Sequence, residues 1–281
     1  MAKRAVLIGV NRYRMPGADL RGCVNDVKNL QATLTRHYGF AKGDVVTLLD
    51  FAASKKAMEA AIRALVRGGR RGDVLLVHFS GHGSNVPDDN GDEAEGRDEI
   101  LCPADLDWKS PFRDDWLRKT FDGLAAGVSL TVIADCCHSG TITRAVQPPD
   151  APMIERYLPS PWDLVAVESG RALRGAMRGG LRQSARAARK ARDVVTVEVP
   201  EVLITGCRDT QTSADAMIGG RFNGALTYHL AAALTEASGS LTYRQLHDAT
   251  TARLKRARFD QVPQLEGSRR RLDQPFLSPI E

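Results

Sequence analysis

"LTVIADCCHSG", residues 130–140, is the stretch of sequence that decides the fold. Its first part, Leu130–Asp135, is an apolar and β-branched run that ends on an acid, and two cysteines, a histidine, a serine and a glycine follow directly. A continuous apolar run of this length is typical of a strand that is buried on both faces of a parallel sheet. Ligands bind beyond the carboxyl ends of such strands, so polar and nucleophilic residues at this position predict a functional site.

Similar apolar runs occur on both sides of this stretch, and helical patterns separate them. Further strands are predicted at Ala5–Val10, Val45–Leu49, Val74–Phe79 and Glu201–Gly206. Helices are predicted at Asn25–His37, Lys55–Arg67, Trp116–Leu124, Asn223–Ala237 with Asn223 as the cap, and Tyr243–Arg256. Strands that alternate with helices indicate an α/β fold with a mostly parallel central sheet and helices on both faces. A chain of 281 residues, 43% of them hydrophobic, fits a single domain over residues 1–281.

A second strand end carries a histidine. The run Val74–Phe79 leads into "SGHGS", in which Gly81 and Gly83 flank His82. The glycines allow a sharp turn and the close approach of a substrate. A thiol and an imidazole at neighbouring strand ends form a nucleophile and base pair. The sequence holds no G-x-S-x-G, GxxxxGK[ST] or HExxH motif and no cysteine spacing suited to zinc.

Six blocks of sequence together resemble one family of enzymes. The blocks are "GCVNDVKNL" (22–30), "HFSGHGS" (78–84), "DDNGDEAEGRDEILCPAD" (88–105), "ADCCHSGT" (134–141), "CRDTQTSADA" (207–216) and "NGALTYHL" (223–230). They resemble the caspase-like cysteine peptidases (clan CD, peptidase C14), most closely the metacaspases and bacterial orthocaspases, and the resemblance implies the caspase-like fold. The Q-A-C-x-G signature of true caspases is absent.

The resemblance implies the catalytic residues. It places the nucleophile at Cys137, the cysteine before His-Ser-Gly, and the base at His82 rather than at His78 inside the strand. The backbone N–H groups of Gly83 and Cys137 would stabilise the oxyanion. Cys136 should point to the opposite side if the strand continues that far.

The resemblance also implies a pocket for the side chain before the scissile bond (P1). Asp26, Asp135 and Ser80 match the residues that line it in metacaspases. Seen alone, Asp26 is equally well explained as an acid that favours the N-terminus of a helix. Two carboxylates pair well with Arg or Lys, so we expect an endopeptidase that acts on protein substrates with a basic P1 residue.

Many metacaspases are activated by calcium, which they bind through aspartates. Asp98, Asp114 and Asp115 match three of those positions, while the fourth is Arg144. A cation in place of an oxygen ligand weakens a site for a hard cation. We therefore expect no metal or other cofactor and no dependence on calcium, with Asp98, Asp114 and Asp115 as at most a weak calcium site.

Residues 141–200 form a long connection that contains an arginine-rich segment, residues 171–192. This segment holds eight of the 39 basic residues and no acid, so the rest of the chain, with 34 acids, is slightly acidic. An enzyme specific for basic residues would find a substrate in its own chain here. We expect a zymogen that is cut after Arg174, Arg178 or Arg182, by itself or by an upstream protease.

Two other classes of protein compete with a peptidase. A catalytically weak scaffold or signalling protein would not need both Cys137 and His82. Nucleic-acid binding would use the arginines of residues 171–192, which recur every three or four positions, but this segment has no aromatic residue to stack on bases. We therefore expect no nucleic-acid partner.

Five cysteines without a CxxC pair favour a reducing cytoplasm over a disulfide framework. No apolar run approaches the length of about 20 residues that crosses a bilayer. We expect a cytoplasmic monomer with no membrane partner, acting in stress, defence or cell-death signalling.

Overall fold

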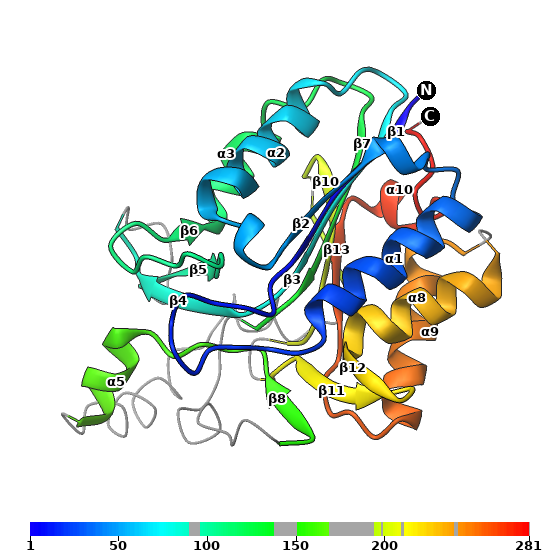
Figure 1. The fold of residues 1–281 in the computed structure, drawn as a ribbon. Helices are drawn as coiled ribbons and strands as arrows, with labels where there is room; N and C mark the ends of the chain where they lie inside the picture. Colours follow the sequence, from blue (N-terminus) through cyan, green and yellow to red (C-terminus); the bar gives the residue numbers. More distant parts are fainter. Residues whose placement is uncertain are drawn as a thin grey trace.

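A seven-stranded sheet forms the centre of the molecule (Figure 1). The computed structural model describes residues 1–89, 96–137, 151–168, 194–197, 199–208, 211–238 and 241–280. In spatial order the strands are β2 (Val45–Leu49), β1 (Lys3–Gly9), β3 (Val74–Ser80), β7 (Ser129–Asp135), β10 (Glu201–Thr205), β13 (Gln264–Gly267) and β9 (Val194–Thr196). The first five pair in parallel, β13 runs antiparallel to β10, and β9 pairs in parallel with β13. The predicted α/β class is confirmed.

Helices cover both faces of this sheet, as Figure 1 shows. One face carries α2 (Lys55–Arg67) and α3 (Asp114–Phe121), and the other carries α1 (Cys23–His37), α8 (Ala225–Ala237) and α9 (Tyr243–Arg256). Successive side chains of a strand point to opposite faces. Accordingly, Val6 and Ile8 of β1 belong to the core cluster on the α2 side, while Ala5 and Leu7 belong to the cluster on the α1 side. Each face of the sheet therefore has its own apolar core.

Two small sheets lie beyond the carboxyl ends of β1, β3 and β7 (Figure 1). One contains β12 (Arg221–Gly224), β11 (Ala214–Ile218) and β8 (Met153–Glu155), and the other contains β4 (Gly83–Pro87), β5 (Arg97–Leu101) and β6 (Phe112–Arg113). The remaining short elements are the 3-10 helices η1 (Lys42–Asp44) and η2 (Asp50–Ala52), and the helices α5 (Pro161–Glu168) and α10 (Arg269–Leu272). The two termini lie side by side at the opposite end of the sheet, where Lys3 Nζ donates to the carbonyl of Leu277 (3.2 Å).

The structure corrects the prediction that Asn223 caps a helix. Asn223 belongs to β12, and its side-chain amide donates to the carbonyls of Ile218 and Arg221. The cap of α8 is Gly224, which has no side chain to accept from the helix, so other parts of the chain supply the acceptors. The tail after α9 also forms β13 and α10, which the sequence analysis did not predict.

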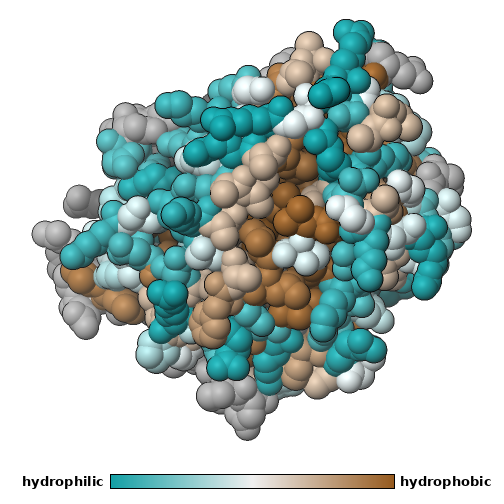
Figure 2. All heavy atoms as spheres, turned by 45° about the horizontal axis from the view of Figure 1, so that its top comes forward, coloured by the Kyte–Doolittle hydropathy of each residue, from teal (hydrophilic) through white to brown (hydrophobic). Residues whose placement is uncertain are grey.

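The face shown in Figure 2 is mostly hydrophilic, and hydrophobic residues gather in its middle. A groove beside α3 is lined by apolar side chains of β3, β7 and β10, among them Phe79, Val132 and Leu203. This groove exists because α2 and α3 cover only part of their face of the sheet. No helix of the described residues is long and apolar enough to span a membrane.

The close approach of α1 to β1 depends on Gly9. A Cβ atom at this position would lie 2.7 Å from the carbonyl oxygen of Cys23 and 2.8 Å from Val27 Cγ2. Gly9→Ala should therefore lower the free energy of unfolding by about 1–3 kcal/mol, the usual cost of overpacking a core. Chemical denaturation measures it, with Gly43→Ala as the control because no atom lies within 4 Å of a Cβ there. Equal stability of the two variants would contradict this account of the packing.

Candidate active site

The strands β1, β3 and β7 end at the same level. Gly9 pairs with Ser80, and Ser80 pairs with Asp135, so the three last residues form one row across the sheet. The chain continues from this row into His82 on one strand and Cys137 on the next. The predicted nucleophile and base therefore leave the sheet side by side.

His82 is oriented by the loop that follows β1. Its Nε2 lies 2.9 Å from the carbonyl oxygen of Ala18, and its backbone N–H donates to the hydroxyl of Tyr13 at 2.8 Å. A carbonyl oxygen only accepts, so Nε2 carries the proton and Nδ1 keeps a lone pair. Nδ1 is buried without a hydrogen-bond partner, and burial lowers the pKa of His82 to about 4. The imidazole is neutral at pH 7 and has a free basic nitrogen.

Cys137 lies in a small buried cluster with Tyr157 and Cys207. Its Sγ accepts the backbone N–H of Ser213 and lies 3.6 Å from the carbonyl oxygen of the same residue. Cys136 belongs instead to the large core cluster on the α2 side, and burial raises the pKa of its thiol. Of the two adjacent cysteines, only Cys137 faces the site.

The two backbone N–H groups expected to form the oxyanion hole converge on one oxygen. Gly83 N and Cys137 N donate to the carbonyl oxygen of Arg156 at 3.0 and 3.2 Å. Two donors aimed at one carbonyl oxygen from different strands are the arrangement that stabilises a developing oxyanion. The sequence analysis named both donors, but it did not anticipate Arg156.

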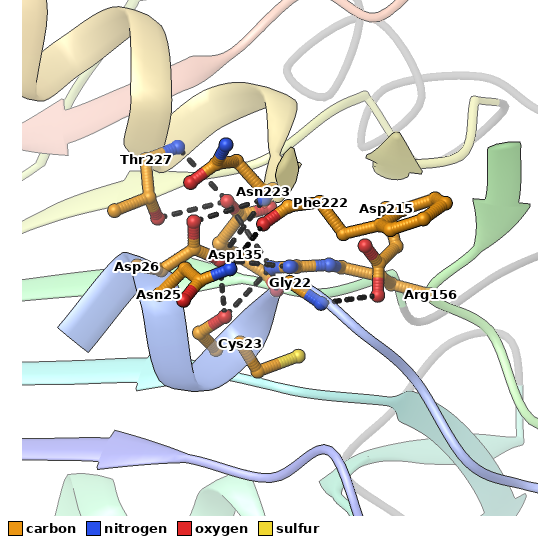
Figure 3. A network of polar contacts seen from close by, with 12 residues as sticks. Gly22, Cys23, Asn25, Asp26, Asp135, Arg156, Asp215, Phe222, Asn223 and Thr227 are labelled. Atoms are coloured by element: carbon orange, nitrogen blue, oxygen red, sulfur yellow. Dashed lines mark hydrogen bonds and ion pairs between the residues drawn. The ribbon is translucent and has the colours of Figure 1, made fainter. Parts of the chain in front are cut away.

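The side chain of Arg156 occupies the predicted P1 pocket (Figure 3). Its Nη2 lies 2.7 Å from Asp26 Oδ2, and its Nη1 lies 3.2 Å from Asp135 Oδ2 and 2.7 Å from Ser80 Oγ. The side chains of Arg156, Asp26 and Asp135 are 0% exposed, so water does not screen these ion pairs. The pocket thus pairs a guanidinium with two carboxylates and a hydroxyl.

The start of α8 helps to hold the two carboxylates. Asp26, in the first turn of α1, accepts from the backbone N–H of Gly224 (2.9 Å). Asp135 accepts from the backbone N–H and the hydroxyl of Thr227 (2.9 and 2.8 Å) and from the hydroxyl of Ser213 (2.6 Å). These bonds satisfy N–H groups that have no partner inside a helix. Asp26 is therefore more than an acid that favours the N-terminus of its own helix, because its carboxylate also accepts from the N–H of Gly224 at the start of α8.

Glycines leave room for the guanidinium. A Cβ atom on Gly224 would lie 2.4 Å from Arg156 Nη1, and one on Gly22 would lie 2.6 Å from Asp215 Oδ1. Asp215 accepts the backbone N–H groups of Arg21 and Gly22 (2.7 and 3.0 Å) and thereby fixes the chain just before α1. A side chain at either glycine would displace the wall of the pocket.

Four residues of the site are not predicted from the sequence: Ala18, Arg156, Ser213 and Thr227. Ala18 and Ser213 act mainly through backbone atoms, which leave no signal in a single sequence. The need for a cation such as Arg156 follows only from the burial of two carboxylates, which the folded structure shows.

The residues predicted as a weak calcium site are not gathered around one point. Asp98 is buried and paired with Arg113, while Asp114 and Asp115 lie in the first turn of α3. The described acids whose oxygens lie within 4.8 Å of one another are Asp88, Asp89 and Asp98. Arg113 pairs with Asp89 (3.0 Å) as well as with Asp98, so a protein cation already supplies the counter-charge. The weak calcium site at Asp98, Asp114 and Asp115 and the independence of calcium both stay predictions.

The arginine-rich segment, residues 171–192, lies outside the described residues, as does Arg144. The predicted cuts after Arg174, Arg178 and Arg182 therefore stay predictions. So does the interpretation of this segment as a surface without a nucleic-acid partner.

Comparisons with known proteins agree with the fold. The family model of the metacaspase peptidase C14 domain matches residues 3–145. A Cryptococcus neoformans metacaspase-1 is 34% identical over 95% of this chain and 62% of its own length, and a Pyricularia oryzae metacaspase-1 is 35% identical over 95% and 72%. A crystal structure of a Geobacter sulfurreducens protein superposes with a TM-score of 0.69 at 29% identity over 100% of both chains.

The caspase-1 structure of Spodoptera frugiperda matches with a TM-score of 0.57 at 13% identity over 95% of this chain and 90% of its own, a likeness of fold alone. Fold and site thus define a caspase-like protein with a cysteine and a histidine at adjacent strand ends. The chain belongs to the metacaspases, which are cysteine-type peptidases of family C14. It spans 62% of the length of the Cryptococcus relative.

The affinity of the pocket for a guanidinium should depend on pH. Burial raises the pKa of Asp26 to about 7, against the lowering effect of the Arg156 guanidinium. The ionised form binds the cation, and its fraction rises about tenfold between pH 6 and pH 8 for a group with this pKa. A Cys137→Ala/Arg156→Ala double variant lacks the guanidinium that lowers this pKa, so agmatine should bind it at least about tenfold more tightly at pH 8 than at pH 6, as measured by calorimetry.

Asp26→Asn in the same background is the control, because it removes the titrating group. It should bind agmatine weakly at both pH values. A double variant that binds equally well at both pH values, with Asp26 in place, would contradict the role of its ionisation.

Proposed function

We propose that this protein is an endopeptidase that cleaves after Arg or Lys, with Cys137 as the nucleophile and His82 as the general base and acid. The observation that carries the proposal is the position of Arg156. Its guanidinium is paired with Asp26 and Asp135 while its carbonyl oxygen accepts from Gly83 and Cys137. An arginine bound in this way has the side chain and the carbonyl of a P1 residue where recognition and chemistry require them.

The reaction follows from these positions. His82, neutral and with a free Nδ1, takes the proton of the Cys137 thiol, and the thiolate attacks the carbonyl carbon of the P1 residue. The N–H groups of Gly83 and Cys137 stabilise the oxyanion, each worth about 3 kcal/mol in comparable sites. The imidazolium then protonates the leaving amine, and water hydrolyses the thioester.

Ser213 sets the resting position of the nucleophile. The thiol sulfur hydrogen-bonds to its backbone rather than to His82, so the thiol has to rotate before the proton is transferred. Such hydrogen bonds in resting enzymes often become productive only once a substrate or transition state is bound. This resting position suits a protein that is made inactive and later activated.

The setting of this activity is part of the same proposal. A peptidase whose pocket is filled by its own chain fits a zymogen that is cut in the connection by itself or by an upstream protease. We expect it to act in the cytoplasm, in stress, defence or cell-death signalling. The hydrogen bond that orients His82, and the N–H groups of Gly83 and Cys137 that meet one carbonyl oxygen, support a peptidase over a catalytically weak scaffold.

Cys137→Ala and His82→Ala should each abolish cleavage of a short reporter peptide with Arg at P1. Cys136→Ala should keep most of the activity, because its side chain packs in the core and not in the site. Initial rates with matched protein concentrations measure the effect, after circular dichroism has shown that each variant is folded. A folded Cys136→Ala without activity beside an active Cys137→Ala would overturn the assignment of the nucleophile.

Reporters with Arg or Lys at P1 should be cleaved at least about a hundredfold faster than the same peptide with Asp. Two buried carboxylates attract a positively charged side chain and repel a negatively charged one. Asp26→Asn should lower kcat/KM for the Arg reporter by about tenfold or more, since it removes the partner of Nη2. Thr120→Ala, on α3 away from the pocket, is a suitable control. Preference for Asp at P1 would refute this account of specificity.

A further inference from the structure

Residues 153–158 cross the active site in the manner of a bound peptide. The strand β8 pairs antiparallel with β11, so that Glu155 faces Ala214 and Ile154 faces Asp215. The next residue, Arg156, continues the pairing, because its N–H donates to the carbonyl of Ser213 at 2.9 Å. A peptide that adds a strand to an exposed edge in this way is bound through its main chain, whatever its sequence.

The chain after Arg156 is held as firmly as the chain before it. Tyr157 forms a bridge with Gly83, and the N–H of Leu158 donates to the carbonyl of Gly83 at 3.0 Å. The hydroxyl of Tyr157 donates to Asp163 at 2.7 Å, and that carboxylate also pairs with Arg97. The peptide bond between Arg156 and Tyr157 is thus fixed from both sides, with its carbonyl oxygen in the oxyanion hole.

The same contacts close the site to other substrates. Arg156 is fully buried and occupies the pocket formed by the carboxylates of Asp26 and Asp135. His82 is 4% exposed and Cys137 is 0% exposed, so neither reaches a substrate from solution. While Arg156 stays in the pocket, the protein is inhibited by its own chain.

From these contacts we propose that the bond between Arg156 and Tyr157 is a self-processing site, and that Arg156 keeps the uncut protein inactive. The inference rests on the proposed function and adds the particular bond. The Cys137 thiolate attacks the carbonyl carbon of Arg156, the bond to the Tyr157 nitrogen breaks, and that nitrogen takes the proton from His82. One water molecule then hydrolyses the thioester, which leaves a carboxylate on Arg156 and restores the thiol.

The cut occurs within one molecule. Arg156 lies buried in the pocket of its own chain, so the pocket of a second copy has no access to it. Processing is therefore first order and independent of protein concentration. Once the bond is broken, the main-chain pairing that holds the cut end is that of the three-residue strand β8, and this short pairing favours its departure.

This site is distinct from the predicted cuts in residues 171–192. A cut there leaves Arg156 attached to Tyr157 and the pocket still filled. Only a break at Arg156, or the loss of its side chain, removes the guanidinium from Asp26 and Asp135. Activation thus depends on one bond rather than on the arginine-rich segment.

The test follows freshly purified full-length protein by intact mass spectrometry and N-terminal sequencing, beside the cleavage of an Arg reporter. Wild type should yield a fragment that begins at Tyr157, at a rate constant that does not change over a tenfold range of concentration, and reporter cleavage should show a lag of the same length. Cys137→Ala should stay uncut at this bond, and added wild type should not cut it there. Arg156→Lys, which keeps a cation, should still be cut.

Arg156→Ala should not be cut at this bond, and it should cleave the reporter without a lag. Its initial rate should be at least about tenfold above that of uncut wild type, the ratio expected when the pocket is open less than a tenth of the time. If Arg156→Ala fails to fold, the comparison of wild type, Cys137→Ala and Arg156→Lys still shows whether Cys137 cuts the bond between Arg156 and Tyr157. Wild type that cleaves the reporter as fast as Arg156→Ala while its bond between Arg156 and Tyr157 is intact would overturn the inference alone, whereas no reporter cleavage by any variant would overturn the proposed function as well.

Discussion

Two carboxylates buried side by side are the constraint on which the rest of this structure depends. Asp26 and Asp135 come from distant parts of the chain, and neither is exposed to water. Burying two like charges is strongly unfavourable unless a cation and hydrogen-bond donors compensate them. The chain meets this need with the first N–H groups of α8, with the hydroxyls of Ser80 and Thr227, and with one arginine. The proposed selectivity for a basic side chain and the need for an internal arginine thus have the same physical origin.

The same arrangement links the pocket to the chemistry. Asp135 ends β7 two residues before Cys137, and Ser80 ends β3 two residues before His82, so each half of the pocket is joined to one half of the proposed catalytic pair. An arginine that satisfies the carboxylates brings its own carbonyl to the N–H groups of Gly83 and Cys137. Recognition of the side chain and polarisation of the peptide bond are therefore one binding event.

The sequence predicts those parts of the molecule that depend on local pattern and on side chains with few roles. Leu130–Asp135 and Val74–Phe79 are recognisable as buried strands, and the helix boundaries of Lys55–Arg67 and Tyr243–Arg256 agree with the structure. Asn223 was assigned to a cap because its residue type favours one, but tertiary contacts from Asp26 and Asp135 replace that cap. Arg156 was not found because its role depends on where a long connection folds back, and no periodicity encodes that.

The neighbouring termini give the molecule a second possible chain order. Lys3 and Leu277 are in contact at the end of the sheet that is remote from Cys137 (Figure 1). A short linker between the ends would leave the central sheet undisturbed, the geometry in which circular permutation is tolerated. A permuted chain that begins at Tyr157 and ends at Arg156 would contain every residue of this sequence in one polypeptide, yet would lack the peptide bond between Arg156 and Tyr157. Such a molecule would be synthesised directly in the open form, with no proteolytic step in its history.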